Sequence, residues 1–372
     1  MQRIILSIFL FIILTPSIVL SQVVNGSCSH IVNTAVEVAA SMCHGIGRNQ
    51  ICYGNVMLNA TPQDGDSNFM FDRVGDIVNV DDLLSLQLSG MNEESGEWGV
   101  AMMSLQTNLP NTLPGQNVIF ILFGDVILQN VTTPEQILNG EFSPMQSFYL
   151  TTGIGQPNCT EVPPNGMLVQ TPQGVGSVNF TVNGIEVAMG STVFFEATNT
   201  TELIATTLEG VAMLEVDDKI YPVLAGTQFG VQQLPNSTQF ASISAYPLTY
   251  DLTDMTVLPF NLLNHEIEIH QPFDEDALLL LQQKLEINEC LCGEFPFYPC
   301  DMLPVVLDGS QCIFPENDKD NNIIAPPPSL ENNNVVAPPP PPENNNVVAP
   351  PPPPENNNVV APPPPPENNN VV

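Results

Sequence analysis

The stretch that decides the fold is Val178-Asn179-Phe180-Thr181-Val182-Asn183-Gly184-Ile185-Glu186-Val187. Apolar and polar residues alternate over 178–182, which is the period of a β-strand with one buried face. Asn183-Gly184 is a favoured two-residue turn of type I′, and a second alternating run follows it. The stretch therefore predicts a β-hairpin whose Asn179 side chain faces solvent.

Similar short runs continue toward the C-terminus at a spacing of about ten residues. Gly210 and Gly226 lie between them, where tight corners favour a residue without a Cβ atom. Residues 145–245 are therefore expected to form a β-sandwich or a short β-roll. The further strands expected here are Thr192–Glu196, Leu203–Leu208, Val211–Val216, Ile220–Leu224 and Gln228–Gln232.

Residues 22–140 combine a helix with further strands. Apolar residues at helical spacing predict a helix over residues 29–43. Two long runs, 99–109 and 117–129, are joined by turn-forming residues 110–115 and predict a hairpin. Residues 118–123 are apolar at every position, so this strand is expected to be buried on both faces. Shorter strand candidates are Val56–Ala60 and Phe69–Phe71.

The C-terminal part divides into two segments. In residues 246–322, acids precede the apolar run 277–281 and Lys284 follows it, which predicts a helix over 274–285. Residues 323–372 repeat a 12-residue unit rich in Pro and Asn, which predicts a disordered, extended polyproline spacer. The fifth unit contains only Val371-Val372, so the tail ends there or continues into a further module or anchor.

The first 21 residues are typical of a secretory signal peptide. Arg3 precedes the apolar segment 4–14, Thr15-Pro16 ends that segment, and cleavage is expected after Ser21. An uncleaved membrane anchor is the alternative, but the apolar run is short for a membrane span. We therefore expect a secreted or cell-surface protein whose mature chain does not insert into the membrane.

An even number of cysteines agrees with an oxidising compartment. A helix between Cys28 and Cys43 places their Cα atoms about 22 Å apart, too far for a direct bridge. We therefore expect the pairs Cys28–Cys52 and Cys43–Cys159. Four further cysteines are expected to pair among themselves, and a zinc site is the alternative for this cluster. They are Cys290, Cys292, Cys300 and Cys312.

Seven Asn-x-Ser/Thr sequons permit N-glycosylation if the host glycosylates exported proteins. They are Asn25, Asn59, Asn130, Asn158, Asn179, Asn199 and Asn236.

The charge balance excludes two classes of function. The 372 residues contain 40 Asp and Glu against 6 Lys and Arg, a net charge of −34. Nucleic-acid binding and attachment to anionic membranes both need basic surfaces, which this composition does not supply. The acids lie mainly in the folded body, because the repeat tail contains only Glu331, Glu343, Glu355 and Glu367.

Residues 167–231 resemble the FecR-type domain, a small β-rich domain of exported and envelope proteins. The resemblance rests on the opening run 167–174, on 208–211 and on 224–228. It implies a FecR-like domain over 141–245, flanked by the regions 22–140 and 246–322. The FecR-type family includes sensors of surface transport, so the resemblance also implies a sensory or accessory ligand-binding role.

The wider stretch 28–245 is similar to uncharacterised bacterial secreted proteins that carry such a domain. Residues 48–55, 96–101 and 113–118 carry this resemblance. It implies export but no activity.

Two groups of residues are candidate metal ligands. Glu266, Glu268 and His270 share one face if residues 264–270 form a strand, although an ordinary edge strand with a polar outer face explains them as well. Asp64, Asp66 and Asn68 begin like a calcium loop, as does segment 318–322, but both lack the later Gly and Glu of an EF-hand. Calcium is therefore the one candidate cofactor.

The sequence contains few of the residues and motifs that are typical of a hydrolytic active site. The histidines are His30, His44, His265 and His270, and no Gly-x-Ser-x-Gly motif occurs. We therefore expect a non-enzymatic exported protein that binds or helps assemble envelope or matrix components, or binds proteins, from a Pro-rich spacer. A FecR-like sensory module and a hydrolase with an unrecognised site are the alternatives.

Overall fold

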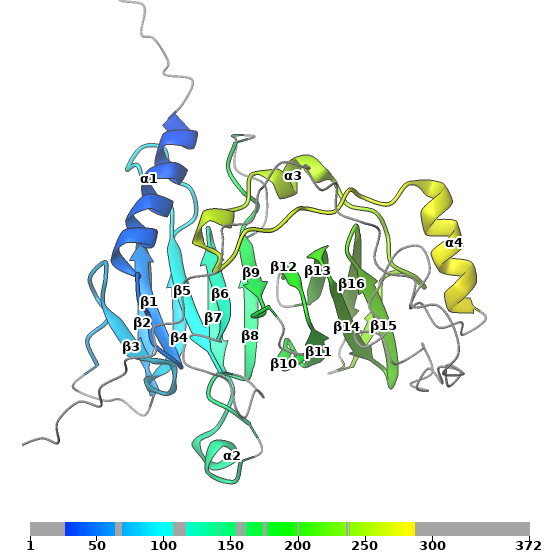
Figure 1. Ribbon diagram of the computed structural model, residues 1–372. Coiled ribbons are helices and arrows are strands. Elements are labelled where there is room, and N and C mark those ends of the chain that lie inside the picture. Colours follow the sequence, from blue (N-terminus) through cyan, green and yellow to red (C-terminus); the bar gives the residue numbers. More distant parts are fainter. Residues whose placement is uncertain are drawn as a thin grey trace, which may run out of the picture. The chain divides into compact units, whose positions relative to one another are not determined.

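The computed structural model describes residues 27–63, 69–106, 117–140, 142–153, 159, 161–173, 177–198, 201–235, 237 and 239–286. Within these ranges the chain is mainly β, as expected, with two large sheets and four α-helices (Figure 1). The helices are α1 (Ser27–Met42), α2 (Pro134–Leu138), α3 (Leu252–Thr256) and α4 (Glu275–Glu286).

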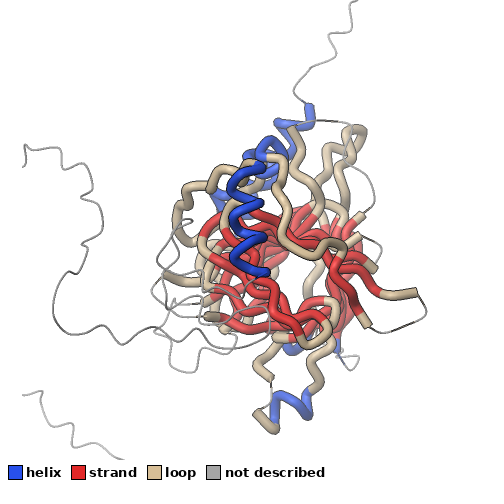
Figure 2. Tube along the Cα trace, turned by 90° about the vertical axis from the view of Figure 1, so that its right-hand side faces the viewer, coloured by secondary structure: helices blue, strands red, loops and turns tan. Residues whose placement is uncertain are grey.

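The two sheets pack against each other as two layers of strands (Figure 2). The nine-stranded sheet has the order β17 (Phe240–Ser242), β16 (Thr227–Gln233), β13 (Glu202–Glu209), β12 (Thr192–Glu196), β9 (Gly166–Gln170), β6 (Val118–Phe123), β5 (Val100–Leu105), β1 (Gln50–Asn55) and β3 (Ile77–Asn79). The eight-stranded sheet has the order β15 (Lys219–Leu224), β14 (Val211–Val216), β11 (Ile185–Met189), β10 (Val178–Val182), β8 (Ser147–Thr152), β7 (Val126–Asn130), β4 (Leu83–Leu88) and β2 (Met57–Pro62).

Both sheets follow the chain almost in order, which Figure 1 shows as a colour gradient across the molecule. From β10 onward, consecutive hairpins alternate between the sheets: β10–β11 and β14–β15 lie in the eight-stranded sheet, β12–β13 and β16–β17 in the other. Each hairpin therefore covers the inner face of the one before it. Neighbouring strands are antiparallel except for the parallel pair β8 and β10.

The predicted hairpin at residues 178–187 is confirmed. Asn183 and Gly184 have φ angles of 51° and 80°, as a type I′ turn requires, and Val182 pairs with Ile185. Asn179 is exposed. The Asn183 side chain is buried and bonds both backbone groups of Leu150, accepting from N at 2.6 Å and donating to O at 2.9 Å. The turn is therefore anchored to β8.

Strand β6 is buried on both faces, as predicted. Val118, Phe120 and Leu122 belong to the core between the sheets. Its other face, with Ile119 and Phe123, lies in a second core beneath α1, α3 and the segment that follows α3. The central strand therefore joins the two cores.

The prediction of one long strand over 117–129 is wrong, because the chain changes sheet at Gly124. Its φ of +77° suits glycine, and a Cβ there would lie 2.1 Å from Oδ1 of Asn165. The same Asn165 oxygen accepts a hydrogen bond from N of Asp125. The residues after this turn form β7 in the opposite sheet. The expected connection at 110–115 lies outside the described residues.

Two short strand predictions are also wrong. Phe69–Phe71 is irregular, and Phe71 packs its ring 5.9 Å from that of Tyr53. Residues 264–270 are extended but belong to neither sheet. Backbone N groups at 264 and 265 bond the side chain of Gln170, so they are satisfied without a neighbouring strand.

The predicted disulfide pairing is wrong, although all four described cysteines are paired. The bridges are Cys28–Cys159 and Cys43–Cys52. A Cys28–Cys52 bridge requires the chain to return along the helix before it reaches Cys52. Instead it turns directly after α1, and β1 begins at Gln50, which places Cys52 beside the helix end. Cys28, at the other end, then meets Cys159. The four cysteines from Cys290 to Cys312 lie outside the described residues.

The boundary expected at residue 140 does not separate two cores. β6 pairs with β9, and β7 pairs with β8, so both sheets continue across it. The described residues belong to one compact unit, and the second unit, 315–372, which contains the repeat tail, lies outside them.

Candidate binding groove

A groove of about 330 Å³ lies on the outer face of the eight-stranded sheet. Its floor is a row of side chains in register across four strands. Thr181 of β10 faces Glu186 of β11, which faces Glu215 of β14, which faces Ile220 of β15. Since alternate residues of a strand point to the same side, the neighbouring inward positions remain in the core.

The second row of the groove is less polar. Asn179, Ala188 and Met213 are in register there, and Met213 also packs against the small apolar core beneath α4. Phe142 and Gln146, from the connection between α2 and β8, complete the rim. The groove therefore combines an apolar wall with two carboxylates.

Glu186 and Glu215 lie directly opposite each other on antiparallel strands, and both are exposed. Like charges in this arrangement destabilise a sheet. The ion pairs within the described ranges are Arg73–Asp72 and His265–Glu209, so neither glutamate has a basic partner there. A neighbouring hollow of about 370 Å³ shares these glutamates and adds Asp217 and Asp218.

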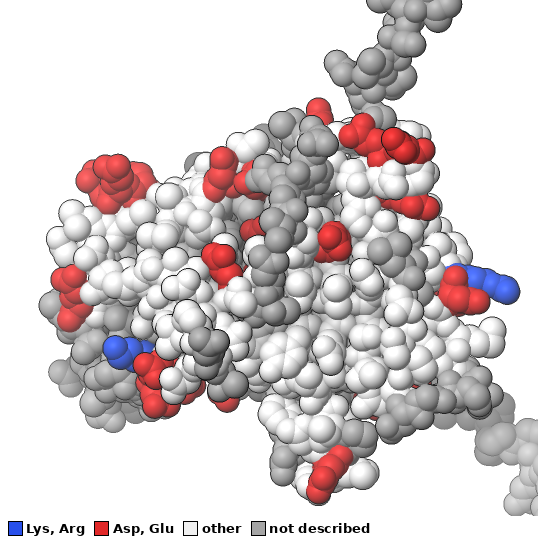
Figure 3. All heavy atoms as spheres, turned by 180° about the vertical axis from the view of Figure 1, so that it is seen from behind, with Lys and Arg blue, Asp and Glu red and all other residues white. Residues whose placement is uncertain are grey.

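This excess of negative charge extends beyond the groove. Figure 3 views one face of the molecule, where acidic side chains form many separate patches and basic side chains only a few. Cationic groups are therefore the natural partners of the surface.

A second acidic group surrounds the end of β12. Burial raises the pKa of Glu196 from its usual 4.5 to about 7, and the negative charges of Asp254 and Glu202 add to the shift. Burial also raises the pKa of Asp254, with a contribution from Asp251. Glu196 thus holds its proton near neutral pH, where α3 packs against the sheet.

We predict that the free energy of unfolding falls as pH rises from 4.5 to 7, because of Glu196. The folded protein holds a proton that the unfolded chain releases, so the stabilisation is present below pH 4.5 and is lost as pH rises through 7. The difference between the two pKa values corresponds to about 3 kcal/mol. Glu196→Gln should therefore raise the free energy of unfolding by about 1–3 kcal/mol at pH 8 and change it little at pH 4.

Urea unfolding at the two pH values measures this effect. Glu161→Gln, which removes a carboxyl group at an exposed position, is the control. An equal gain for Glu196→Gln at both pH values would contradict the role of its proton.

The metal ligands predicted from sequence do not come together. Glu266, Glu268 and His270 are all exposed on the extended segment, and Nδ1 of His270 lies 2.8 Å from O of Gln271. The alternation was correct, because Ile267 and Ile269 pack inward. Asp64, Asp66 and Asn68 lie outside the described residues, as does 318–322.

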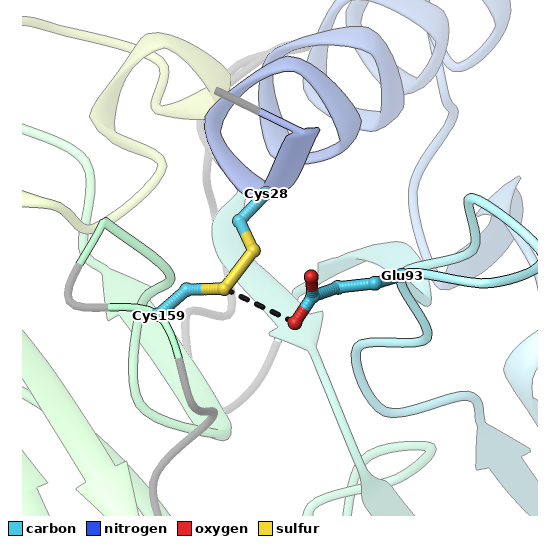
Figure 4. Close-up of a disulfide and its surroundings, with 3 residues drawn as sticks. All are labelled: Cys28, Glu93 and Cys159. Carbon is cyan, nitrogen blue, oxygen red and sulfur yellow. Dashed lines mark hydrogen bonds between the residues drawn. A yellow bond between two sulfur atoms is a disulfide. The ribbon is translucent and has the colours of Figure 1, made fainter. Parts of the chain in front are cut away.

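Sequence reasoning missed the contact between the Cys28–Cys159 disulfide and Glu93, which Figure 4 shows. Oε1 of Glu93 lies 3.4 Å from Sγ of Cys159. A disulfide sulfur carries no proton to donate, so this is a close contact and not a hydrogen bond. Within the described ranges these three residues are the one group of His, Cys, Asp or Glu close enough to share a metal ion, but both sulfurs are bonded to each other.

The sequons differ in accessibility. Asn59 and Asn179 are exposed, whereas Asn130 is buried. Nδ2 of Asn130 donates to O of Leu83, and its Oδ1 accepts from N of Thr132. The folded structure therefore leaves no room for a glycan at Asn130, which corrects that candidate. Asn25, Asn158, Asn199 and Asn236 lie outside the described residues.

The histidines lie at separate places in the fold. His30 lies near the start of α1, His44 lies just after its end, and both are exposed. His265 contacts Glu209 at 3.8 Å. Across the residues that the structure describes, no helix has the length and apolar character needed to cross a membrane.

Comparisons with known proteins find little. No family model matches the chain, and no curated protein matches it. Two crystal structures of a "putative anti-sigma factor" from Parabacteroides distasonis have TM-scores of 0.24 and 0.23 at 7% and 8% identity. The alignments cover 39% and 40% of this chain. They cover 56% and 61% of the two matched chains. A similarity this low carries no argument, so the FecR-type resemblance stays a prediction.

Proposed function

We propose that the protein is an exported, non-enzymatic binding protein. Its groove captures a cationic and partly apolar segment of an envelope or matrix protein. The observation that carries the proposal is the Glu186–Glu215 pair in the floor of the groove. Two opposed carboxylates cost stability in the free protein, and a bound cation removes that cost.

Two further features support the proposal. The apolar wall with Phe142 and Met213 gives a partner surface to bury, which selects against purely polar cations. The two disulfides in the described part of the chain agree with an oxidising compartment outside the cytoplasm. The signal peptide and the Pro-rich spacer, both expected from sequence, agree with a binding domain that is exported and held at the cell surface.

A peptide titration tests the groove. The full chain is mixed with a peptide of alternating Lys and Leu, with one of alternating Lys and Ser, and with one of alternating Glu and Leu. We expect the Lys-Leu peptide to bind most tightly, with an affinity that falls as salt concentration rises. Glu186→Gln with Glu215→Gln should weaken this binding about tenfold, because each exposed ion pair contributes up to about 1 kcal/mol.

The stability of the same double variant serves as a control for its effect on binding. Removing like charges that face each other should raise the free energy of unfolding by a few tenths of a kcal/mol, up to about 1. Loss of binding together with gain of stability separates a binding role from a structural one. Phe142→Ser removes part of the apolar wall and should also weaken binding. Glu37→Gln combined with Glu161→Gln removes the same number of charges at exposed positions outside the groove, so it controls for net charge. Unchanged affinity in the double variant would refute the groove as the binding site.

A further inference from the structure

A second cavity of about 330 Å³ lies far from the groove in the fold, on the outer face of the nine-stranded sheet. It is bordered by the end of α1, by β5 and β6, and by residues 261–264, which include the end of the 3₁₀-helix η3 (Phe260–Leu262). Its polar lining comes from His44, Ser104, Asn117, Asn261 and Asn264, and its apolar lining includes Met102 and Ile119.

The walls of this cavity are held in place from two sides. The Cys43–Cys52 disulfide ties the end of α1 to β1. On the other side, the buried Gln170 accepts hydrogen bonds from backbone N of Asn264 and His265 at 3.0 and 3.2 Å, and donates to O of His265 at 3.0 Å. The cavity is therefore preformed, which favours ligand binding because little ordering is needed.

One lining residue has an unmet hydrogen-bonding need. Asn117 is 7% exposed, and its Nδ2 donates to Oγ of Ser104 at 2.9 Å. Its buried Oδ1 has no hydrogen-bond partner in the described part of the structure. Leaving a buried acceptor unpaired is costly, so this oxygen is suited to a ligand that brings a donor.

The lining also indicates the charge of that ligand. The chain carries 40 acidic residues, yet none is among the described residues that line the cavity, and neither Lys nor Arg is. Buried or bound charges are normally paired, so a neutral ligand fits best. The side-chain oxygens of Asn261 and Asn264 are further acceptors. Hydroxyl groups supply donors to these acceptors and accept from the Asn amides in return.

We propose that this cavity binds a neutral sugar residue of an envelope or matrix polysaccharide. The site is independent of the peptide groove, because it lies on the other sheet and shares no lining residue with it. The protein would then contact both the protein and the polysaccharide of the same matrix.

The test is calorimetry of the full chain with cellohexaose, xylohexaose, mannohexaose and chitohexaose. We expect at least one to bind with a dissociation constant in the millimolar range or below. Asn261→Ala combined with Asn264→Ala should weaken that binding about tenfold, since the removed amides provide hydrogen bonds to the sugar. Both side chains are exposed, so the variant should fold. Asn33→Ala, at an exposed position on α1, is the matched control.

Asn117→Leu provides a second line of evidence. It removes the unpaired oxygen, so it should abolish sugar binding while leaving Lys-Leu peptide binding unchanged. Absence of binding by the wild-type chain to all four sugars at millimolar concentration would overturn the proposal. Binding that survives both the double variant and Asn117→Leu would also overturn it. Failure of peptide binding alone would affect only the groove.

Discussion

Replacing Cys28 and Cys159 together by alanine is expected to lower the free energy of unfolding by about 5 kcal/mol. The bridge joins residues 131 positions apart, and the entropy of closing a loop of that length accounts for the size of the effect. Removing Cys43 and Cys52 should cost only about 2.6 kcal/mol, because their separation is 9. The two double variants are therefore matched in chemistry and differ mainly in loop length.

Guanidinium unfolding of the oxidised proteins measures both costs. A cost for the Cys28/Cys159 pair no larger than that for Cys43/Cys52 would contradict the loop-length explanation.

The rate at which a thiol reduces the Cys28–Cys159 bridge tests the contact with Glu93. Thiolates attack disulfides as anions, and the Glu93 carboxylate 3.4 Å from Sγ of Cys159 should repel them. In a chain that keeps the Cys28–Cys159 bridge, Glu93→Gln should therefore speed reduction of this bridge by an anionic thiol. The free energy of unfolding should not change.

Phe120→Ala is expected to lower the free energy of unfolding by about 3–5 kcal/mol. Phe120 is fully buried in the core between the sheets. Its ring meets those of Phe148 and Phe180 edge-on, with centroids 6.1 and 5.4 Å away. Truncation therefore removes apolar burial and two aromatic contacts, and it leaves a cavity that strands from both sheets border.

The control for this variant is Tyr149→Ala. Tyr149 is also an aromatic residue on a strand, but it is 44% exposed on the outer face of β8. Its truncation should cost less than about 1 kcal/mol. Similar costs for the two variants in urea unfolding would show that the core between the sheets does not dominate stability.

Local patterns predicted the strands well where one face is buried and the turn is short. The Asn183-Gly184 hairpin was predictable because the turn type, the alternation and the burial all point the same way. The doubly buried β6 was predictable from six apolar residues in a row. The break at Gly124 was missed, although Gly124-Asp125 interrupts the apolar run and is a turn signal. That the chain changes sheet there depends on the contact with Asn165, which lies 40 residues after Asp125.

The disulfide pairing failed for a related reason. Helix length excluded a Cys28–Cys43 bridge correctly, but the path of the chain after the helix depends on where β1 joins the sheet. That position depends on tertiary contacts, and the local sequence does not indicate it. The same holds for residues 264–270, whose alternating pattern suits a strand while Gln170 takes up backbone groups that a strand would pair.

The groove could not be predicted because it depends on strand register. Glu186 and Glu215 are 29 positions apart in the sequence, and the sequence does not show that they face each other. Their outward direction was predictable, since each lies between buried neighbours. The cavity on the nine-stranded sheet was harder still to predict, because its walls come from the end of α1, from β5 and β6, and from residues 261–264.

The segment between β17 and α4 links strands that are not neighbours in the nine-stranded sheet. Leu248 exchanges backbone hydrogen bonds with Gln228 of β16, and N of His270 donates to O of Leu208 in β13. Between these points the segment reaches Gln170 of β9, and residues 261–264 line the cavity together with the end of α1. Its length is therefore matched to the number of strands that it crosses. Inserting or deleting a hairpin in this sheet would require a compensating change in the length of this segment.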